Sequence, residues 1–274
     1  MTLNRIFQFA CWCAVLALVI SASADQTATT QAATTSAIGP LSRIQRPPEN
    51  FHLPSGTTYV YGAEWRLWTA GTASIRIETT GQQQRVTGSA DATGVTALLF
   101  GVRDRFESYF DPHTFCSQRI FKHTEEGFHK RETSISFDYG RRKSVLDEVN
   151  LRNGDRKHTE QEIPSCVTDV LSGVFYASSL PLQVGSEYLF PINDGGKTID
   201  VRLHVEAREQ VKTDAGTFPT LRVQPEASSG VLKDRGRVWI WYSDDARRIP
   251  VQVRARMFWG TLTLRLQRVE RQTP

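Results

Sequence analysis

The sequence predicts a mainly β protein, with one strongly curved antiparallel sheet or partly closed barrel and one main helix packed on it. Three observations support this fold class. Runs of alternating apolar and polar residues recur at short, regular intervals through the chain. Turn-forming residues separate these runs, and a single segment, Asp169–Leu180, has the periodicity of a helix.

The first residues have the pattern of a secretory signal peptide. Arg5 precedes an apolar run from Ile6 to Ile20, and the small residues Ala22-Ser23-Ala24 follow it. This run is shorter than the about 20 residues that a membrane-spanning helix needs, and no later stretch is apolar enough to span a bilayer. We therefore expect cleavage after Ala24 and a periplasmic or secreted protein; an uncleaved N-terminal anchor is the alternative.

The composition then changes twice along the chain. Residues 25–50 are rich in Thr, Ala and Gln, which cannot bury enough apolar surface to fold. We expect a signal peptide over residues 1–24, a flexible leader over 25–50 and a single β-rich domain over 51–272.

The positive charges that give the chain its net charge of +4 are scattered, except at Arg141-Arg142-Lys143. We interpret this run as a solvated turn, with contact to anionic lipid or lipopolysaccharide as the alternative, and expect no nucleic-acid partner.

Paired strands are expected in the first half of the domain. Residues 57–67 place five residues on one face: Tyr59, Tyr61, Ala63, Trp65 and Leu67. This period-two pattern is typical of a half-buried strand, and residues 74–78 predict its partner. Residues 116–123 and 129–137 predict a second strand pair, joined near Gly127.

The helix and the last third of the chain complete the predicted domain. Thr168 or Asp169 can cap the helix, and Leu180-Pro181 ends it. Four apolar residues recur at helical spacing: Val170, Leu171, Val174 and Phe175. A run of hairpins follows, with strands expected over residues 188–192, 199–205, 221–223, 238–242, 251–253 and 257–266.

Two cysteines remain after removal of the signal peptide, which carries Cys11 and Cys13. An even pair in an oxidising compartment indicates a disulfide between Cys116 and Cys166. The bond would attach the start of the helix to a strand. Closing a loop of about 50 residues stabilises a fold by roughly 4 kcal/mol in the chain-entropy model. Two separate buried thiols are the alternative.

No catalytic motif is recognisable. The sequence lacks a Gly-x-Ser-x-Gly elbow, and Gly196-Lys197-Thr198 lacks the earlier glycine of a phosphate-binding loop, since Pro191 stands there. Its six histidines form neither His-x-x-x-His nor His-Glu-x-x-His. We interpret the carboxylate pairs Asp244-Asp245 and Glu125-Glu126 as turn residues. We therefore expect a non-enzymatic protein without a cofactor or metal.

The aromatic residues are more informative. Residues 238–242 are apolar on both faces, so this strand is either covered on both sides or lines an internal cavity. The favoured interpretation is a large β core with the helix packed on one face. The alternative is a barrel cavity for an apolar ligand. Its candidate lining residues are Trp65, Phe175, Trp239, Trp241 and Trp259.

An ordered series of segments resembles a known family. The segments are Asp104-Arg105-Phe106-Glu107-Ser108-Tyr109, Asp169-Val170-Leu171-Ser172, Leu180-Pro181-Leu182, Asp194-Gly195-Gly196-Lys197, Ala215-Gly216-Thr217-Phe218, and Trp241-Tyr242-Ser243-Asp244-Asp245 with Arg248-Ile249-Pro250. Over roughly residues 55 to 270 they resemble the bacterial family called domain of unknown function 3108. The resemblance implies an exported protein of a Gram-negative bacterium, without an established activity and without catalytic residues to transfer.

The β-rich build of that family is similar to the half-open barrel of periplasmic lipoprotein carriers, whose curved sheet and helical lid enclose an acyl-binding cavity. We therefore expect non-enzymatic binding of a lipid, a lipoprotein acyl chain or another apolar group, or a role in envelope maintenance. One alternative is a structural or interaction module that binds an envelope protein through sheet edges or a flat face. Another is an unrecognised hydrolase with Asp, Glu or His residues converging in a pocket.

Overall fold

The computed structural model describes residues 43–49, 51–66, 68–94, 97, 101–193, 197–227, 236–257 and 260–271. The expected signal peptide, the leader as far as residue 42, and Trp259 lie outside these described residues. Among the helices of the described ranges, none has the length and apolar character that crossing a membrane requires.

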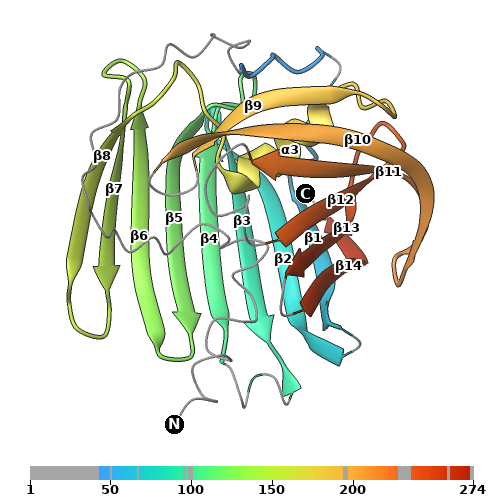
Figure 1. The fold of residues 1–274 in the computed structure, drawn as a ribbon, viewed down its shortest axis with the longest axis horizontal. Coiled ribbons are helices and arrows are strands. Elements are labelled where there is room, and N and C mark those ends of the chain that lie inside the picture. Colours follow the sequence, from blue (N-terminus) through green and yellow to red (C-terminus); the bar gives the residue numbers. More distant parts are fainter. Residues whose placement is uncertain are drawn as a thin grey trace, which may run out of the picture.

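Within the described residues, fourteen strands form one antiparallel sheet that is not closed, with β8 and β9 at its two edges (Figure 1). The order across the sheet is β8-β7-β6-β5-β4-β3-β2-β1-β14-β13-β12-β11-β10-β9. The strands are β1 (Thr57–Trp65), β2 (Trp68–Thr80), β3 (Gln83–Ala92), β4 (Arg103–Phe110), β5 (Ser117–Glu126), β6 (His129–Asp138), β7 (Lys143–Asn150), β8 (Arg156–Glu162), β9 (Glu187–Asn193), β10 (Thr198–Thr213), β11 (Gly216–Ala227), β12 (Gly236–Ser243), β13 (Pro250–Met257) and β14 (Gly260–Arg271). The predicted fold class, a curved antiparallel sheet with one helix, is confirmed.

Strand β1 shows why these segments become strands. Its predicted apolar face is buried at Tyr59, Tyr61 and Ala63, while Trp65 at its end is only partly buried. Because successive side chains of a strand point to opposite faces, this alternation directs one face of β1 to the core. The strands β3, β7 and β8 were not predicted from the sequence, because few of their residues are apolar.

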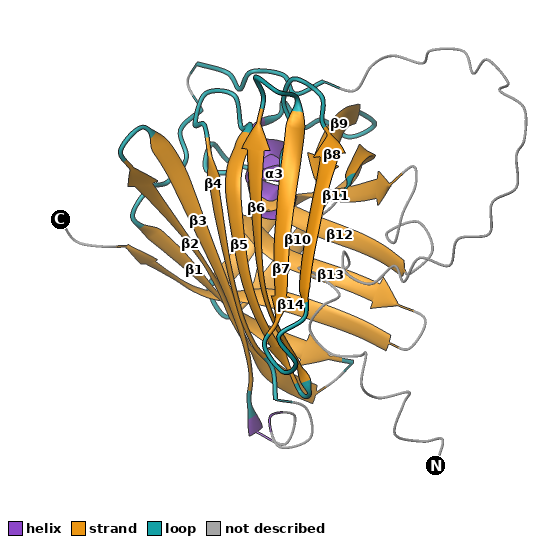
Figure 2. Ribbon diagram, turned by 90° about the vertical axis from the view of Figure 1, so that its left-hand side faces the viewer, coloured by secondary structure: helices purple, strands orange, loops and turns teal. Residues whose placement is uncertain are grey.

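The helix α3 (Val170–Ser179) lies inside the curve of the sheet (Figures 1 and 2). Asp169 is its N-cap, and its side chain forms a capping box with Ser172, which decides between the two predicted caps. Leu180 is the C-cap, as the sequence predicted. The hydroxyl of Tyr242 on β12 donates to the carbonyl of Val174 at 2.7 Å, so the helix is bonded to the second half of the sheet.

The main core fills the space between the helix and the sheet. Phe175 and Tyr176 of α3 are buried in it together with side chains from both halves of the sheet. Aromatic rings form a chain through its centre: the ring centroids of Phe110 and Phe115 are 5.3 Å apart, those of Phe115 and Tyr176 5.7 Å, and those of Tyr176 and Phe190 4.8 Å. The interior on the helix side is therefore packed with side chains.

The disulfide between Cys116 and Cys166 is present, with the two Cα atoms 5.1 Å apart. Cys116 immediately precedes β5, and Cys166 lies just before α3. Next to the bond, the backbone N–H of Ser117 donates to the carbonyl of Val167 at 2.8 Å. The start of the helix is thus attached to β5 by a covalent bond and a hydrogen bond.

The long β10–β11 hairpin curves around the second half of the sheet (Figure 1). Beyond its pairing with β12, the hairpin passes the β12–β13 turn, where the N–H of Asp244 donates to the carbonyl of Pro219 at 2.8 Å. Its tip reaches β14, where the N–H of Ala215 donates to Leu266 at 3.3 Å. Asp244 and Asp245 lie in this turn and pair with arginines, in agreement with their interpretation as turn residues.

Candidate functional site

A buried polar group joins α3 to the inner face of β4 and β5. The carboxylate of Asp169 accepts the hydroxyls of Ser108 at 2.5 Å, Ser117 at 2.6 Å and Ser172 at 2.8 Å. It also accepts the backbone N–H groups of Leu171 at 2.8 Å and Ser172 at 3.1 Å. Five hydrogen-bond donors therefore converge on this buried carboxyl group, so its oxygens are well satisfied. Asp169 therefore fixes the position of the first helical turn.

A narrow cleft lies beside this group. It runs between the first turn of α3, the inner face of β4 and β5, and the end of β9, with a free volume of about 10 Å³. Its walls are apolar at Phe106, Ile120, Val170 and Leu171 and polar at Lys122, Asp169 and Asn193. The Lys122 side chain is buried, with a residue exposure of 8 %. The cleft thus combines apolar walls with a buried ammonium group.

The cleft shares Ile120 with a second apolar cluster. Ile120, Ile135 and Leu146 are buried together on β5, β6 and β7, and Phe137 packs against them. This cluster is separate from the main core. The end of β9 reaches its rim, where the side-chain amide of Asn193 donates to the hydroxyl of Ser144 on β7 at 3.5 Å. The backbone N–H of Asn193 also donates to the carbonyl of Thr168 at 2.7 Å, so the end of β9 is held beside the start of α3 as well.

The residues expected around an apolar cavity come from different elements of the structure. Phe175 is buried in the main core. Trp241 is also buried, but its indole N–H donates to the Glu209 carboxylate, and the guanidinium of Arg254 lies 5.3 Å from its ring centroid. Since the neighbouring Tyr242 bonds to the helix, Trp241 points to the face of β12 away from α3. Phe175 and Trp241 nevertheless belong to the same main core cluster, and Trp65 and Trp239 pack against it.

Of the other expected lining residues, Trp239 lies two positions before Trp241 and so shares its face. Trp65 lies at the end of β1, with its indole packed over the backbone of Gly260. The sequence analysis did not identify Lys122 or the cluster of Ile120, Ile135 and Leu146. The alternation of residues 118–122 could have indicated that Ile120 and Lys122 share the buried face of a strand.

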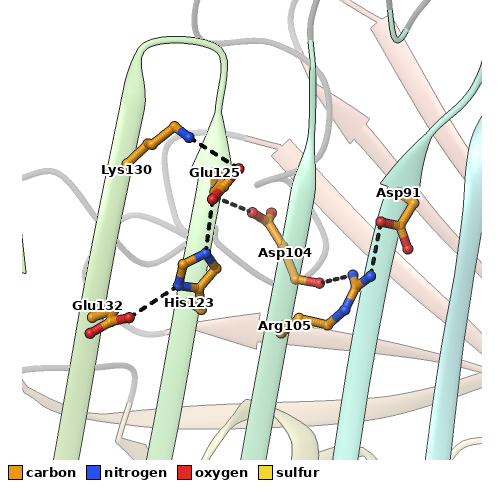
Figure 3. Close-up of polar contacts among 7 residues, drawn as sticks. All are labelled: Asp91, Asp104, Arg105, His123, Glu125, Lys130 and Glu132. Atoms are coloured by element: carbon orange, nitrogen blue, oxygen red, sulfur yellow. Dashed lines mark hydrogen bonds and ion pairs between the residues drawn. The ribbon is translucent and has the colours of Figure 1, made fainter. Parts of the chain in front are cut away.

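Several charged side chains lie near Asp104, where β4 begins and β5 ends (Figure 3). Asp104 is 1 % exposed, and its carboxylate accepts the backbone N–H of Glu125 at 3.1 Å. Burial raises the pKa of Asp104 to about 8, the neighbouring charge of Glu126 adds to the rise, and the Glu125 N–H opposes it. Asp104 is therefore expected to be protonated near neutral pH.

The outer side of the same strands carries an ion-pair network (Figure 3). His123 contacts Glu125 at 3.2 Å and Glu132 at 3.4 Å, and Lys130 contacts Glu125 at 3.3 Å. The hydrogen bond from His123 is the main cause that lowers the pKa of Glu125, followed by the bond from Lys130. Among the described residues, no group of three or more His, Cys, Asp or Glu side chains is arranged to hold a metal ion.

Comparisons with known proteins identify relatives only at the level of family and fold. A family profile described as "Protein of unknown function (DUF3108)" matches residues 60–267. No curated protein matches the chain. A β-barrel-like protein of domain of unknown function DUF1849 from Brucella abortus has a similar solved structure, with a TM-score of 0.56 and 7% identity over 79% of this chain and 98% of that one. At this identity the likeness shows the fold alone.

Two other solved structures align with lower scores. One is a candidate lipoprotein from Parabacteroides distasonis, with a TM-score of 0.35 and 12% identity over 80% of this chain and 97% of that one. The other is a candidate exported protein with a YmcC-like fold from Bacteroides fragilis, with a TM-score of 0.33 and 11% identity over 81% of this chain and 98% of that one.

Proposed function

The chain belongs to the DUF3108 family of proteins of unknown function, and from its geometry we propose that it is an exported, non-enzymatic envelope protein that binds the acyl chain of a lipid or lipoprotein. The proposed site is the cleft between α3 and the inner face of β4 and β5, continuing over the second apolar cluster. The observation that carries the proposal is this cluster of Ile120, Ile135 and Leu146, which lies apart from the main core and leads to Lys122.

The chemistry of the cleft fits an acyl chain with a negatively charged end. Ligand sites combine apolar walls with a few polar groups that fix orientation. Here the apolar walls suit methylene groups, and the ammonium of Lys122 suits a carboxylate or phosphate oxygen. Because the cleft has a volume of only about 10 Å³, a chain enters only if the end of β9 moves. Such a movement would break the 3.5 Å contact between Asn193 and Ser144, whereas the bonds between Thr168 and β9 would keep the strand beside the start of α3.

Export is part of the proposal. It rests on the signal-peptide pattern of residues 1–24 and on the disulfide between Cys116 and Cys166, a bond that persists in oxidising compartments such as the periplasm. The alternative of an interaction module that adds a strand to the sheet has less support. The edge strand β8 has the sequence RKHTEQE and is mostly exposed, and charged edges disfavour strand addition. At the other edge, Thr168 already bonds to Pro191 and Asn193 of β9.

Native mass spectrometry tests the proposal. Protein purified from the periplasm without detergent is expected to carry lipid, and delipidated protein is expected to take up a long-chain fatty acid. Ile120→Ser and Lys122→Gln should each reduce uptake. Phe121→Ser is the matched control, because Phe121 lies between them on β5 but is exposed on the other face. Absence of both co-purified lipid and fatty-acid uptake would overturn the proposal, as would an equal loss in the control.

A further inference from the structure

Several turns lie side by side where the strands end on one side of the sheet. Strands β1 to β8 are neighbours in chain order and pair antiparallel. The β1–β2, β5–β6 and β7–β8 turns therefore lie at the same end of the strands (Figure 1). We call Arg66, Trp68 and residues 127–131 and 150–157 the hairpin edge. The Arg141–Lys143 run follows β6 and therefore lies at the opposite edge.

Each of the three turns presents one large apolar side chain to solvent. Trp68 is 75 % exposed, Phe128 65 % and Leu151 43 %. Single exposed apolar residues are ordinary, but a series of them along one edge marks an interaction surface. Tryptophan and phenylalanine are also the residues that insert at the boundary between water and lipid. These three side chains therefore suit contact with a membrane surface.

The charge of the hairpin edge points to an anionic partner. Residues 127–131 and 150–157 contain five cations and one carboxylate: Lys130, Arg131, Arg152, Arg156, Lys157 and Asp155. Glu125 pairs with Lys130 at 3.3 Å and Glu148 with Arg131 at 3.5 Å, which offsets part of this charge. Arg152 contacts two neutral groups of Phe128: its backbone carbonyl at 3.2 Å and its ring, whose centroid is 5.4 Å away.

An open hollow of about 340 Å³ lies between the β5–β6 and β7–β8 turns. Its lining combines one aromatic ring with basic and amide side chains and contains no carboxylate: Phe128, His129, Lys130, Arg131, Asn150, Arg152 and Asn153. The two turns are fixed to each other, because the N–H of Leu151 donates to the carbonyl of Lys130 at 2.9 Å. The hollow is thus formed before a ligand arrives, and its donors suit a phosphate group.

We propose that the hairpin edge docks on a bilayer that contains anionic phospholipid. The phosphate of a lipid headgroup occupies the hollow, and Trp68, Phe128 and Leu151 enter the interfacial layer. This inference goes beyond the proposed acyl-binding function. The cleft beside α3 and the hairpin edge use different residues, so either proposal can fail while the other stands.

Vesicle co-sedimentation tests the docking surface. The purified protein is expected to bind vesicles of phosphatidylcholine with phosphatidylglycerol, to bind phosphatidylcholine alone much more weakly, and to detach as salt is raised. The double variant K130Q/R152Q should bind anionic vesicles about 25-fold more weakly, at roughly fivefold for each lost charge. W68S/F128S should also bind anionic vesicles more weakly. This loss should be measured at a salt concentration where electrostatic attraction alone does not hold the protein on the vesicles.

A control variant tests whether vesicle binding depends on the basic residues of the hairpin edge or on basic charge anywhere on the protein. R141Q/R142Q removes the same charge from the opposite edge and should leave vesicle binding unchanged. An equal loss in this control would overturn the proposal, as would equal binding to neutral and anionic vesicles. Inorganic phosphate, followed by NMR shifts of the hollow residues, distinguishes a free phosphate site. Binding of phosphate without binding of vesicles would also contradict docking on a membrane.

Discussion

Asp104 on β4 and Glu125 on β5 are joined by a hydrogen bond of 3.1 Å from the Glu125 backbone N–H to the buried Asp104 carboxyl group. The bond spans the β4–β5 pair next to the bridge between Val102 and Glu126. It therefore places a buried acid between two acidic neighbours at the end of β5.

This arrangement predicts a dependence of stability on pH. The folded pKa of Asp104, about 8, is above its unfolded value of 3.8, so the folded state binds more protons between these values. The contribution of protonated Asp104 to the free energy of unfolding is fully present below about pH 4 and is lost as pH rises towards about 8. Asp104→Asn resembles the protonated form and should be more stable than the parent chain at about pH 8.

Urea unfolding at several pH values checks this expectation. The difference between Asp104→Asn and the parent should grow as pH rises towards about 8, because only the parent releases a proton from this position on unfolding. Asp91→Asn is the matched control, since Asp91 is a partly exposed carboxylate on the neighbouring strand, where it pairs with Arg105 at 3.0 Å. A pH-independent difference for Asp104→Asn would show that its charge state does not control stability.

The disulfide predicts a loss of stability on reduction. Replacing Cys116 and Cys166 by serine removes a cross-link between positions 50 residues apart. The free energy of unfolding should fall by about 4 kcal/mol in the chain-entropy model. Thermal unfolding with and without a reducing agent measures the effect. The double serine variant is the control, because its melting temperature should not respond to the reductant.

The carboxylate of Asp169 predicts a larger effect than an ordinary helix cap. Asp169→Ala removes the cap and leaves the buried hydroxyls of Ser108 and Ser117 without this acceptor. We expect a loss of about 3 kcal/mol or more, since a cap contributes about 1 kcal/mol and each unsatisfied buried group costs about 1–3 kcal/mol. Denaturant unfolding measures this loss.

Ser178→Ala is the comparison for Asp169→Ala. The Ser178 hydroxyl donates to the carbonyl of Phe175 within the same helix, at 2.7 Å. Its loss should therefore be small. If the two substitutions destabilise the protein equally, Asp169 acts as a local feature of the helix and does not hold α3 on the sheet.

The sequence alone identified the features that depend on neighbouring residues. The alternation in β1 predicted its buried face, because side chains of an extended chain alternate strictly. The position of α3 followed from Asp169, the apolar spacing after it and Pro181. The cysteine count, together with the signal-peptide pattern, predicted the bond between Cys116 and Cys166.

The tertiary structure decided the features that depend on pairing between distant segments. The strand β8 has almost no apolar residues, and it is a strand because its backbone pairs with β7. Trp241 lies opposite Arg222 because of the β11–β12 register, which residue composition does not reveal. Lys122 lies beside α3, and Asp104 beside Glu125, only because β4 and β5 pair in one particular register. Register fixes which side chains share a face, and hydrogen bonds between segments far apart in the chain determine it.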